Sequence, residues 1–243
     1  MPRNPEDEPK SSTHETRKNE QSEKRHKRSP GRPKIPLDRI IDAALEIIDT
    51  QGIDALSMRS IAQHLDSGTA TLYRHFSGRT ELIGLVVDRI MAEATPARQN
   101  DANDDWQTVL ASSARSMYAI LNRHRGIATL LMESMPDGPN SMEFRERLLG
   151  LLLSNGFSTI IASRAFATIS RFVLGFAIQY EEQSKPDANQ QRATSEFQKA
   201  VDSKRYPALQ AAAAYLPVSL DDEFEFGLGL ILSGLSNLKE KGA

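Results

Sequence analysis

Apolar residues recur three or four positions apart along most of the chain. In the first such stripe, from Leu37 to Ile48, they mark one face of a helix that Gly52 ends. Strand signals are nearly absent, because no stretch alternates apolar and polar residues over the length of a strand between turn residues. The pattern therefore predicts an all-α protein.

The remaining stripes predict two sets of helices. Residues 95–105 are polar and contain Pro96, so we expect them to separate a small N-terminal set from a larger C-terminal set. After the first helix, the expected helices lie at about 57–65, 72–73, 79–90, 106–121, 127–135, 144–152, 158–183, 207–216 and 220–240. Ser57 and Ser219 are candidate N-caps, and the polar stretch 184–195 is typical of a mobile loop.

Residues 1–34 differ from the rest of the chain because they hold one apolar residue, Met1. Such a segment cannot bury enough surface to offset the entropy cost of ordering, so we expect a disordered tail. Its last acid is Glu23, and six Lys and Arg residues follow between positions 24 and 34. We therefore expect a flexible basic arm that binds DNA phosphates, and a solvated tail without a role is the alternative.

Composition excludes several classes of protein. The chain has 243 residues and no cysteine, which excludes a disulfide framework, an iron–sulfur cluster, a thiolate zinc site and a cysteine nucleophile. Its five histidines are scattered without a metal-ligand spacing. We expect no enzyme activity, no metal and no cofactor. After the tail, no stretch approaches the ~18 apolar residues of a membrane span, so we expect a soluble, intracellular protein that makes no membrane contact.

The segment Leu56–Leu82, LSMRSIAQHLDSGTATLYRHFSGRTEL, carries the most informative pattern. A short amphipathic helix, the polar turn 66–68 and a second short helix follow one another, which is the order of a helix-turn-helix motif. Leu72 and Phe76 can face inward, while hydroxyl, phenol and cationic side chains leave a second face suited to phosphates and base edges. The alternative is that these polar residues merely cap a small helical core.

The stretch from Leu37 to Leu82 resembles the DNA-binding domain of the TetR (tetracycline repressor) family of bacterial transcription regulators. The resemblance rests on AAL at 43–45, LSMR at 56–59, IA at 61–62 and above all LYRHF at 72–76. Later stretches resemble more weakly the tetracycline-repressor-like ligand-binding and dimerisation domain: DWQTVL, HRGIATLL, NGFS, FVLGF and FEFGLGLILSGL. The implied domains are a disordered basic arm at 1–34, a helix-turn-helix domain at 35–82 and a helical ligand-binding and dimerisation domain at 83–243.

The resemblance implies that the second helix of the motif faces the major groove and that Arg79 clamps the DNA backbone. Together with the arm, the implied DNA-binding residues are Arg32, Ser57, Arg59, Thr69, Ala70, Thr71, Tyr73, Arg74, His75 and Arg79. The family usually has Gly-Val-Ser in the turn. Asp66-Ser67-Gly68 therefore removes an apolar plug and adds an acid near the DNA.

Charge is distributed unevenly behind the formal net charge of −2. The tail carries +4, residues 35–94 carry −4 and residues 95–243 carry −2. A DNA-reading domain of negative net charge needs cations from elsewhere, and we expect the arm and the arginines of the motif to supply them.

The resemblance also implies a two-fold dimer and a ligand pocket in the larger domain. The helices at 158–183 and 220–240 would form a four-helix bundle with their copies, and core within one chain is the alternative. The implied interface residues are Phe176, Phe224, Leu228, Ile231, Gly234, Leu235 and Leu238. The implied ligand-binding residues are Thr95, Ser113, Met117, Leu131, Ser134, Met135, Pro136, Arg147, Phe166, Ser170 and Phe172. The methionines favour an adaptable apolar pocket.

The expected function is that of a ligand-responsive transcriptional regulator of the bacterial cytoplasm, associated with the nucleoid. As a repressor, it would bind a palindromic operator in double-stranded DNA as a homodimer and be released by a small apolar effector. The alternative is a helical adaptor or effector-binding protein with a vestigial helix-turn-helix, which would not bind promoter DNA.

Overall fold

The computed structural model describes residues 35–94, 105–133, 136–183, 202 and 204–240. Every regular element in these ranges is helical, which confirms the all-α fold expected from the hydrophobic periodicity. The elements are α1 (Leu37–Gln51), η1 (Ile53–Ala55), α2 (Met58–His64), α3 (Thr69–Leu72), α4 (Arg79–Ala94), α5 (Trp106–Arg123), α6 (Ile127–Glu133), α7 (Pro139–Ser154), α8 (Thr159–Gln183), α10 (Pro207–Ala212), η2 (Ala213–Tyr215) and α11 (Leu220–Glu240). The expected arm at 1–34 and loop at 184–195 lie outside the described residues.

The helix boundaries follow the capping residues of the sequence. Gly52 ends α1 with φ +84°, a conformation that costs glycine little because it has no Cβ. The Ser57 Oγ accepts a hydrogen bond from the backbone N–H of Ser60 at 3.0 Å, which confirms Ser57 as the N-cap of α2. Pro139 begins α7 at a first-turn position where proline is favoured, so the proline-rich break after α6 is also the start of the next helix.

Helix α4 belongs to both sets of helices. It packs against α1 and also against α5 and α7, and it continues without interruption across the expected domain boundary between residues 82 and 83. Leu82, Val86 and Ile90 on α4 are fully buried and belong to one hydrophobic core that runs from α1 to α11. A displacement of α4 would therefore change the packing of both sets of helices.

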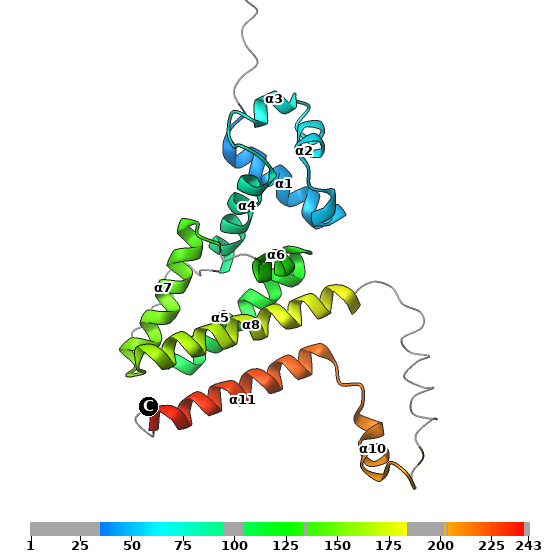
Figure 1. Ribbon diagram of the computed structural model, residues 1–243, viewed down its shortest axis with the longest axis vertical. Helices are drawn as coiled ribbons and strands as arrows, with labels where there is room; N and C mark the ends of the chain where they lie inside the picture. The colour runs from blue at the N-terminus through cyan, green and yellow to red at the C-terminus, as the bar shows by residue number, and fades with distance from the viewer. Residues whose placement is uncertain (1–34, 95–104, 134–135, 184–201, 203, 241–243) are drawn as a thin grey trace, which may run out of the picture. The chain divides into compact units, whose positions relative to one another are not determined.

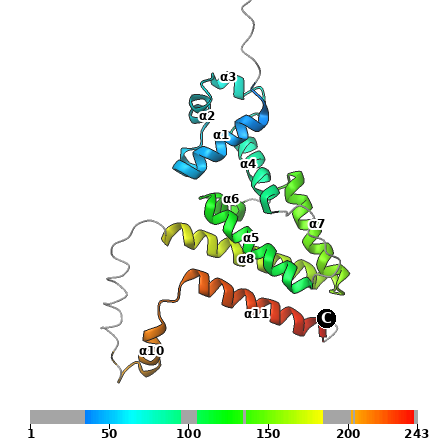
Figure 2. The same ribbon diagram turned by 180° about the vertical axis from the view of Figure 1, so that it is seen from behind.

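Helix α8 is the central element of the C-terminal set. It packs against α5, α6, α7 and α11, and it lies alongside α11 in both views (Figures 1 and 2). The Phe224 ring of α11 stacks on the ring of Tyr118 from α5, at 4.3 Å between ring centroids, and on that of Phe172 from α8, at 5.3 Å. A Cβ on Gly227 would lie 2.7 Å from the Phe172 ring, so this glycine is what lets α11 approach α8.

The segment Thr159–Tyr180 of α8 is long and apolar enough, at a mean hydropathy of 1.4, to match a membrane span. The expectation that no stretch approaches such a span is therefore wrong by length and composition alone. One such helix is weak evidence for a membrane, since core helices of soluble proteins pass the same criterion. In the described chain, 28% of this segment is buried, and α5, α6, α7 and α11 pack against it.

Candidate functional site

Helices α2 and α3 form a helix-turn-helix despite the unusual turn. The backbone N–H of Ser67 donates to the carbonyl of Ala62 at 2.8 Å and closes the end of α2. Asp66 takes the left-handed conformation, with φ +46°, and Gly68 is the N-cap of α3 with φ −88°. The turn therefore uses an aspartate, which tolerates this conformation better than most residues, at the point that needs positive φ.

Helix α3 and the turn that follows it, residues 73–76, together separate an apolar face from a polar one. Leu72 is fully buried and Phe76 nearly so, which confirms that they face the core. Tyr73 is 55% exposed, a high value for a large aromatic side chain. Of the other predicted DNA-binding residues here, Thr69, Ala70 and Arg74 are exposed and Thr71 and His75 are half-buried. The polar face lies free within the described chain and has the shape and chemistry of a recognition surface.

The predicted DNA contacts before and after residues 69–75 have different surroundings. Arg59 on α2 is exposed, whereas the Ser57 hydroxyl is used in capping α2. Arg79 donates through Nε to the carbonyl of Leu56 at 3.0 Å and through Nη2 to that of Ile53 at 3.3 Å. Arg79 therefore ties the start of α4 to the turn before α2. Arg32 lies outside the described residues.

The acids of α1 are largely committed to contacts within the chain. Asp42 pairs with Arg89 at 3.0 Å, and Glu46 lies 3.0 Å from the Nε2 of His64. Asp49 lies 2.6 Å from the Nδ1 of His124 at the end of α5. These contacts explain part of the negative charge of residues 35–94, because the acids connect α1 to other helices.

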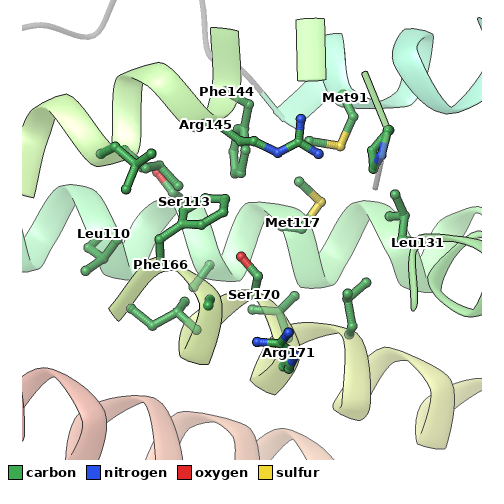
Figure 3. A pocket seen from close by; sticks show the side chains of 18 of the residues that line it. Met91, Leu110, Ser113, Met117, Leu131, Phe144, Arg145, Phe166, Ser170 and Arg171 are labelled. Carbon is green, nitrogen blue, oxygen red and sulfur yellow. The ribbon is translucent and has the colours of Figure 1, made fainter. Parts of the chain in front are cut away.

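A pocket of about 540 Å³ lies among α4, α5, α6, α7 and α8, a volume suited to a small-molecule ligand. Six predicted ligand-binding residues line it: Ser113, Met117, Leu131, Pro136, Phe166 and Ser170. Figure 3 labels five of these six, all but Pro136, together with lining residues that were not predicted: Met91, Leu110, Phe144, Arg145 and Arg171. The missed apolar residues stand on helix faces that periodicity assigns to core in general, and the sequence carries no signal that separates Arg145 and Arg171 from other surface cations.

Two other predicted pocket residues, Phe172 and Arg147, do not line it. Phe172 turns to the aromatic cluster with Phe176 and Phe224, because α11 covers that face of α8. Arg147 does not line the pocket itself, but its Nη2 donates a hydrogen bond at 3.4 Å to the Oγ of Ser113, which does. Thr95, Ser134 and Met135 lie outside the described residues. In the described part of the chain, no three His, Cys, Asp or Glu side chains gather in a way that would hold a metal ion.

Asp88 connects α4 to the wall of the pocket. This carboxylate is 7% exposed and accepts hydrogen bonds at the N-terminus of α7, from the Ser141 backbone at 3.0 Å and from the Asn140 Nδ2 at 2.8 Å. Three residues further along α4, Met91 lines the pocket, and α7 contributes Phe144 to it. The hydrogen bonds of Asp88 therefore hold α4 and α7 together beside the pocket.

A second junction connects α1 to the end of α5. The Nδ1 of His124 lies 2.6 Å from the Oδ1 of Asp49, and its Nε2 lies 3.5 Å from the Oε1 of Glu93 on α4. The histidine is 3% exposed. Next to it, Gly126 has φ +86° and leaves no room for a Cβ against Ile53 of η1. Polar and steric contacts therefore connect the small N-terminal set of helices to the end of α5.

The predicted dimer residues divide between core and surface. Phe224, Leu228 and Leu235 are buried within the single chain, so the alternative reading as core holds for these three. Phe176 and Ile231 are half-buried, whereas Gly234 and Leu238 are exposed. The sequence analysis missed the more exposed apolar side chains of the same helices: Phe226 (71%) and Leu230 (59%) on α11 and Ile160 (64%) on α8. A Cβ on Gly229 or Gly234 would have no atom of the described residues within 4 Å.

Two family models match the chain. The model described as "Bacterial regulatory proteins, tetR family" matches residues 40–86, and the model described as "Tetracyclin repressor-like, C-terminal domain" matches residues 98–238. The first match contains α2 and α3, and the second contains α5 to α8 and most of α11.

Characterised proteins match over most of their length. The HTH-type transcriptional repressor DrrR1 of Streptomyces coeruleorubidus is 31% identical over 88% of this chain and 82% of its own. The class A tetracycline repressor protein from transposon 1721 of Escherichia coli is 31% identical over 84% of this chain and 91% of its own. Apo ActR of Streptomyces coelicolor superposes with a TM-score of 0.77 at 31% identity, covering 87% of this chain and all of that one. ActR has also been solved with actinorhodin, at a TM-score of 0.74 and 31% identity, covering 85% of this chain and 98% of that one.

Proposed function

Because the chain belongs to the TetR family of bacterial transcription regulators, we propose that it is a ligand-responsive repressor. In this proposal, the protein binds a palindromic operator as a homodimer in the cytoplasm, at the nucleoid, and a small effector in the pocket releases it. The observation that carries the proposal is that one helix, α4, packs against α1 of the DNA-reading set and also lines the pocket through Met91.

The polar face of α3 supplies the DNA contacts of the proposal. Tyr73 and Arg74 are exposed there, and Arg59 is exposed on the preceding helix. A phenol and short hydroxyl groups suit phosphates, and arginine suits guanine or phosphate. In our proposal, Ser57 and Arg79 act indirectly, since their polar groups already hold α2 and α4 in place. The basic arm adds charge that is independent of base sequence.

Binding to the chain's own promoter region tests the DNA side. We expect the full chain to retain a promoter fragment in an electrophoretic mobility shift assay and to protect a palindrome from cleavage. Tyr73→Ala should weaken retention about tenfold, on the scale of one or two lost contacts. The matched control is Tyr215→Ala, which removes a 79% exposed tyrosine from η2. If no promoter fragment is retained, the adaptor with a vestigial motif becomes the better reading.

Deletion of residues 1–34 tests the arm separately. The deletion should weaken operator binding and flatten its dependence on salt, because fewer counterions are released. Unchanged affinity with an unchanged salt slope would favour the solvated tail without a role.

The dimer interface of the proposal lies on the exposed side of α11 and α8. Phe226, Leu230 and Ile160 offer apolar surface there, and Gly229 and Gly234 leave room for another helix to approach. The buried residues of the same helices support this surface from behind. A two-fold dimer would place two reading helices on the two halves of a palindrome.

Light scattering coupled to size-exclusion chromatography tests this interface. We expect a dimer at micromolar concentration, and Phe226→Glu should shift it towards the monomer because a charge would be buried at the contact. The control is Tyr215→Glu, which puts the same charge at an exposed position on η2. A monomeric wild-type chain would contradict the proposed dimer.

In our proposal, the hydrogen bonds between Asp88 and the N-terminus of α7 couple effector binding to the position of the DNA-reading helices. An effector that fills the pocket contacts α7 and Met91 of α4, and it shifts the equilibrium between two positions of α4 only if it fits one of them better. Asp88 fastens α4 to the N-terminus of α7, so the two helices would move together. The displacement would reach α1 and change the spacing of the two reading helices.

A further inference from the structure

Among the described residues, the pocket is lined by cations and by no anion. Arg145 from α7 and Arg171 from α8 are the two charged residues among these lining side chains, and no described Asp or Glu lines it. Figure 3 shows Arg145 beside Phe144 and Met91 on one side of the pocket and Arg171 on the α8 side. Neither arginine forms an ion pair with a described residue.

A third cation, Arg147, contacts a residue that lines the pocket. It donates to the Oγ of Ser113, which lines the pocket, and its guanidinium lies 5.9 Å from the centre of the Phe144 ring. Its Nε is buried and has no hydrogen-bond partner among the described residues. Burial lowers the pKa of Arg147, and the nearby charge of Glu143 acts in the opposite direction. The position therefore holds a partly desolvated cation with a donor left unused.

We infer that the pocket takes an apolar molecule that bears one anionic group, such as a carboxylate or a sulfonate. The anion lies between Arg145 and Arg171, and Arg147 acts on it through Ser113. Arg145 is half-buried and Arg171 is exposed, and an anion between them gains charge-assisted hydrogen bonds that a neutral apolar ligand cannot form. This inference rests on the proposed function in taking the pocket as the effector site.

Two fluorescent probes that differ in one group test the inference. 8-Anilinonaphthalene-1-sulfonate carries an anion, and N-phenyl-1-naphthylamine is the same aromatic frame without it. Each probe is titrated into the full-length protein, and the ratio of their two affinities is compared between variants. We expect Arg145→Met and Arg171→Met each to lower the affinity for the sulfonate about tenfold, the scale of one charge-assisted hydrogen bond, and to leave the affinity for the neutral probe unchanged.

Control variants separate the pocket from other cations of the chain. Arg164→Met removes an exposed arginine of α8 that does not line the pocket, so it should change neither affinity. Arg147→Lys keeps the charge behind Ser113 and should preserve most of the preference for the anion. An affinity ratio that is the same in the wild type, Arg145→Met and Arg171→Met overturns the inference, as does an equal loss of both probes.

The failure of this inference is distinguishable from failure of the proposed function. The same proteins are assayed for retention of the promoter fragment without any probe. A wild-type chain that retains no promoter DNA contradicts the proposed repressor, while the probe ratio continues to decide whether the pocket selects an anion.

Discussion

At the scale of single residues, the turn of the helix-turn-helix shows how local chemistry is preserved when the sequence changes. Asp66 takes the left-handed conformation, and the Ser67 N–H still closes α2. Aspartate tolerates this conformation better than most residues. Which of the three turn residues adopts it was decided by the hydrogen bonds at the end of α2.

Asp66→Asn should tighten operator binding about twofold, because it removes a negative charge near the DNA backbone while Asn keeps the tolerance for positive φ. Fluorescence anisotropy with a labelled operator measures the change, and thermal unfolding checks that stability is unaltered. Glu240→Gln, which removes the same charge at the end of α11, should leave affinity unchanged. Equal or weaker binding by Asp66→Asn would show that the acid does not face the phosphates.

At the scale of elements, the glycines of α11 have different roles. The resemblance implied that Gly234 lies at an interface with a second copy, whereas the structure places a close helix approach within the chain, at Gly227 against Phe172. Gly234 has open space beside it. Periodicity cannot make this distinction, since the neighbour of each glycine depends on tertiary packing.

Gly227→Ala should lower the free energy of unfolding by about 1–3 kcal/mol, because the new methyl group overlaps the Phe172 ring. Gly234→Ala should instead favour the helix of an isolated protomer by up to about 1 kcal/mol and weaken the dimer by filling its crossing point. Urea unfolding and light scattering report the two effects. If Gly234→Ala leaves the dissociation constant of the dimer unchanged, the crossing point lies elsewhere.

The ion pair between α5 and α11 should make stability depend on pH. Arg115 donates to both carboxylate oxygens of Glu225, at 2.7 and 2.6 Å. These hydrogen bonds hold the pKa of Glu225 below its ordinary value of 4.5. A carboxyl whose pKa is depressed by folding stabilises the fold above its unfolded pKa, and this contribution is lost as pH falls through the folded pKa.

Glu225→Gln should therefore cost about 0.5 kcal/mol at neutral pH, a small value because both side chains are about half exposed to solvent. The difference from the wild type should disappear at a pH well below 4.5. Thermal unfolding over a pH series measures this convergence. A difference that persists in acid would mean that packing, and not charge, accounts for the loss.

At the scale of the whole molecule, the junction at His124 decides whether the two sets of helices respond as a unit. The histidine is buried at the end of α5 and contacts Asp49 of α1, so it joins segments that are far apart in the sequence. The sequence analysis treated His124 as one of several scattered histidines. Nothing in its sequence neighbourhood identifies its partner, because the contact arises from the packing of α1 against the body.

His124→Ala should lower the free energy of unfolding by about 2 kcal/mol, since it leaves Asp49 without its hydrogen bond and opens a small cavity. His64→Ala is the matched control, because His64 pairs with Glu46 at the surface and should contribute less than about 1 kcal/mol. A double-mutant cycle of His124→Ala with Asp49→Asn should give a coupling energy of about 1 kcal/mol. Additive losses would contradict a direct link between the two residues.

The sequence by itself determined the helical class, the places of the helices, their main caps and the family of regulators to which the chain belongs. These features depend on local periodicity, on capping chemistry and on a motif that is continuous along the chain. The tertiary structure decided which apolar residues line the pocket, which pack in the core and which stay exposed on α11. It also brought Arg145 and Arg171 to one cavity and Asp49 to His124. Such contacts join residues from different helices, and the spacing within one helix carries no information about the partner that it meets.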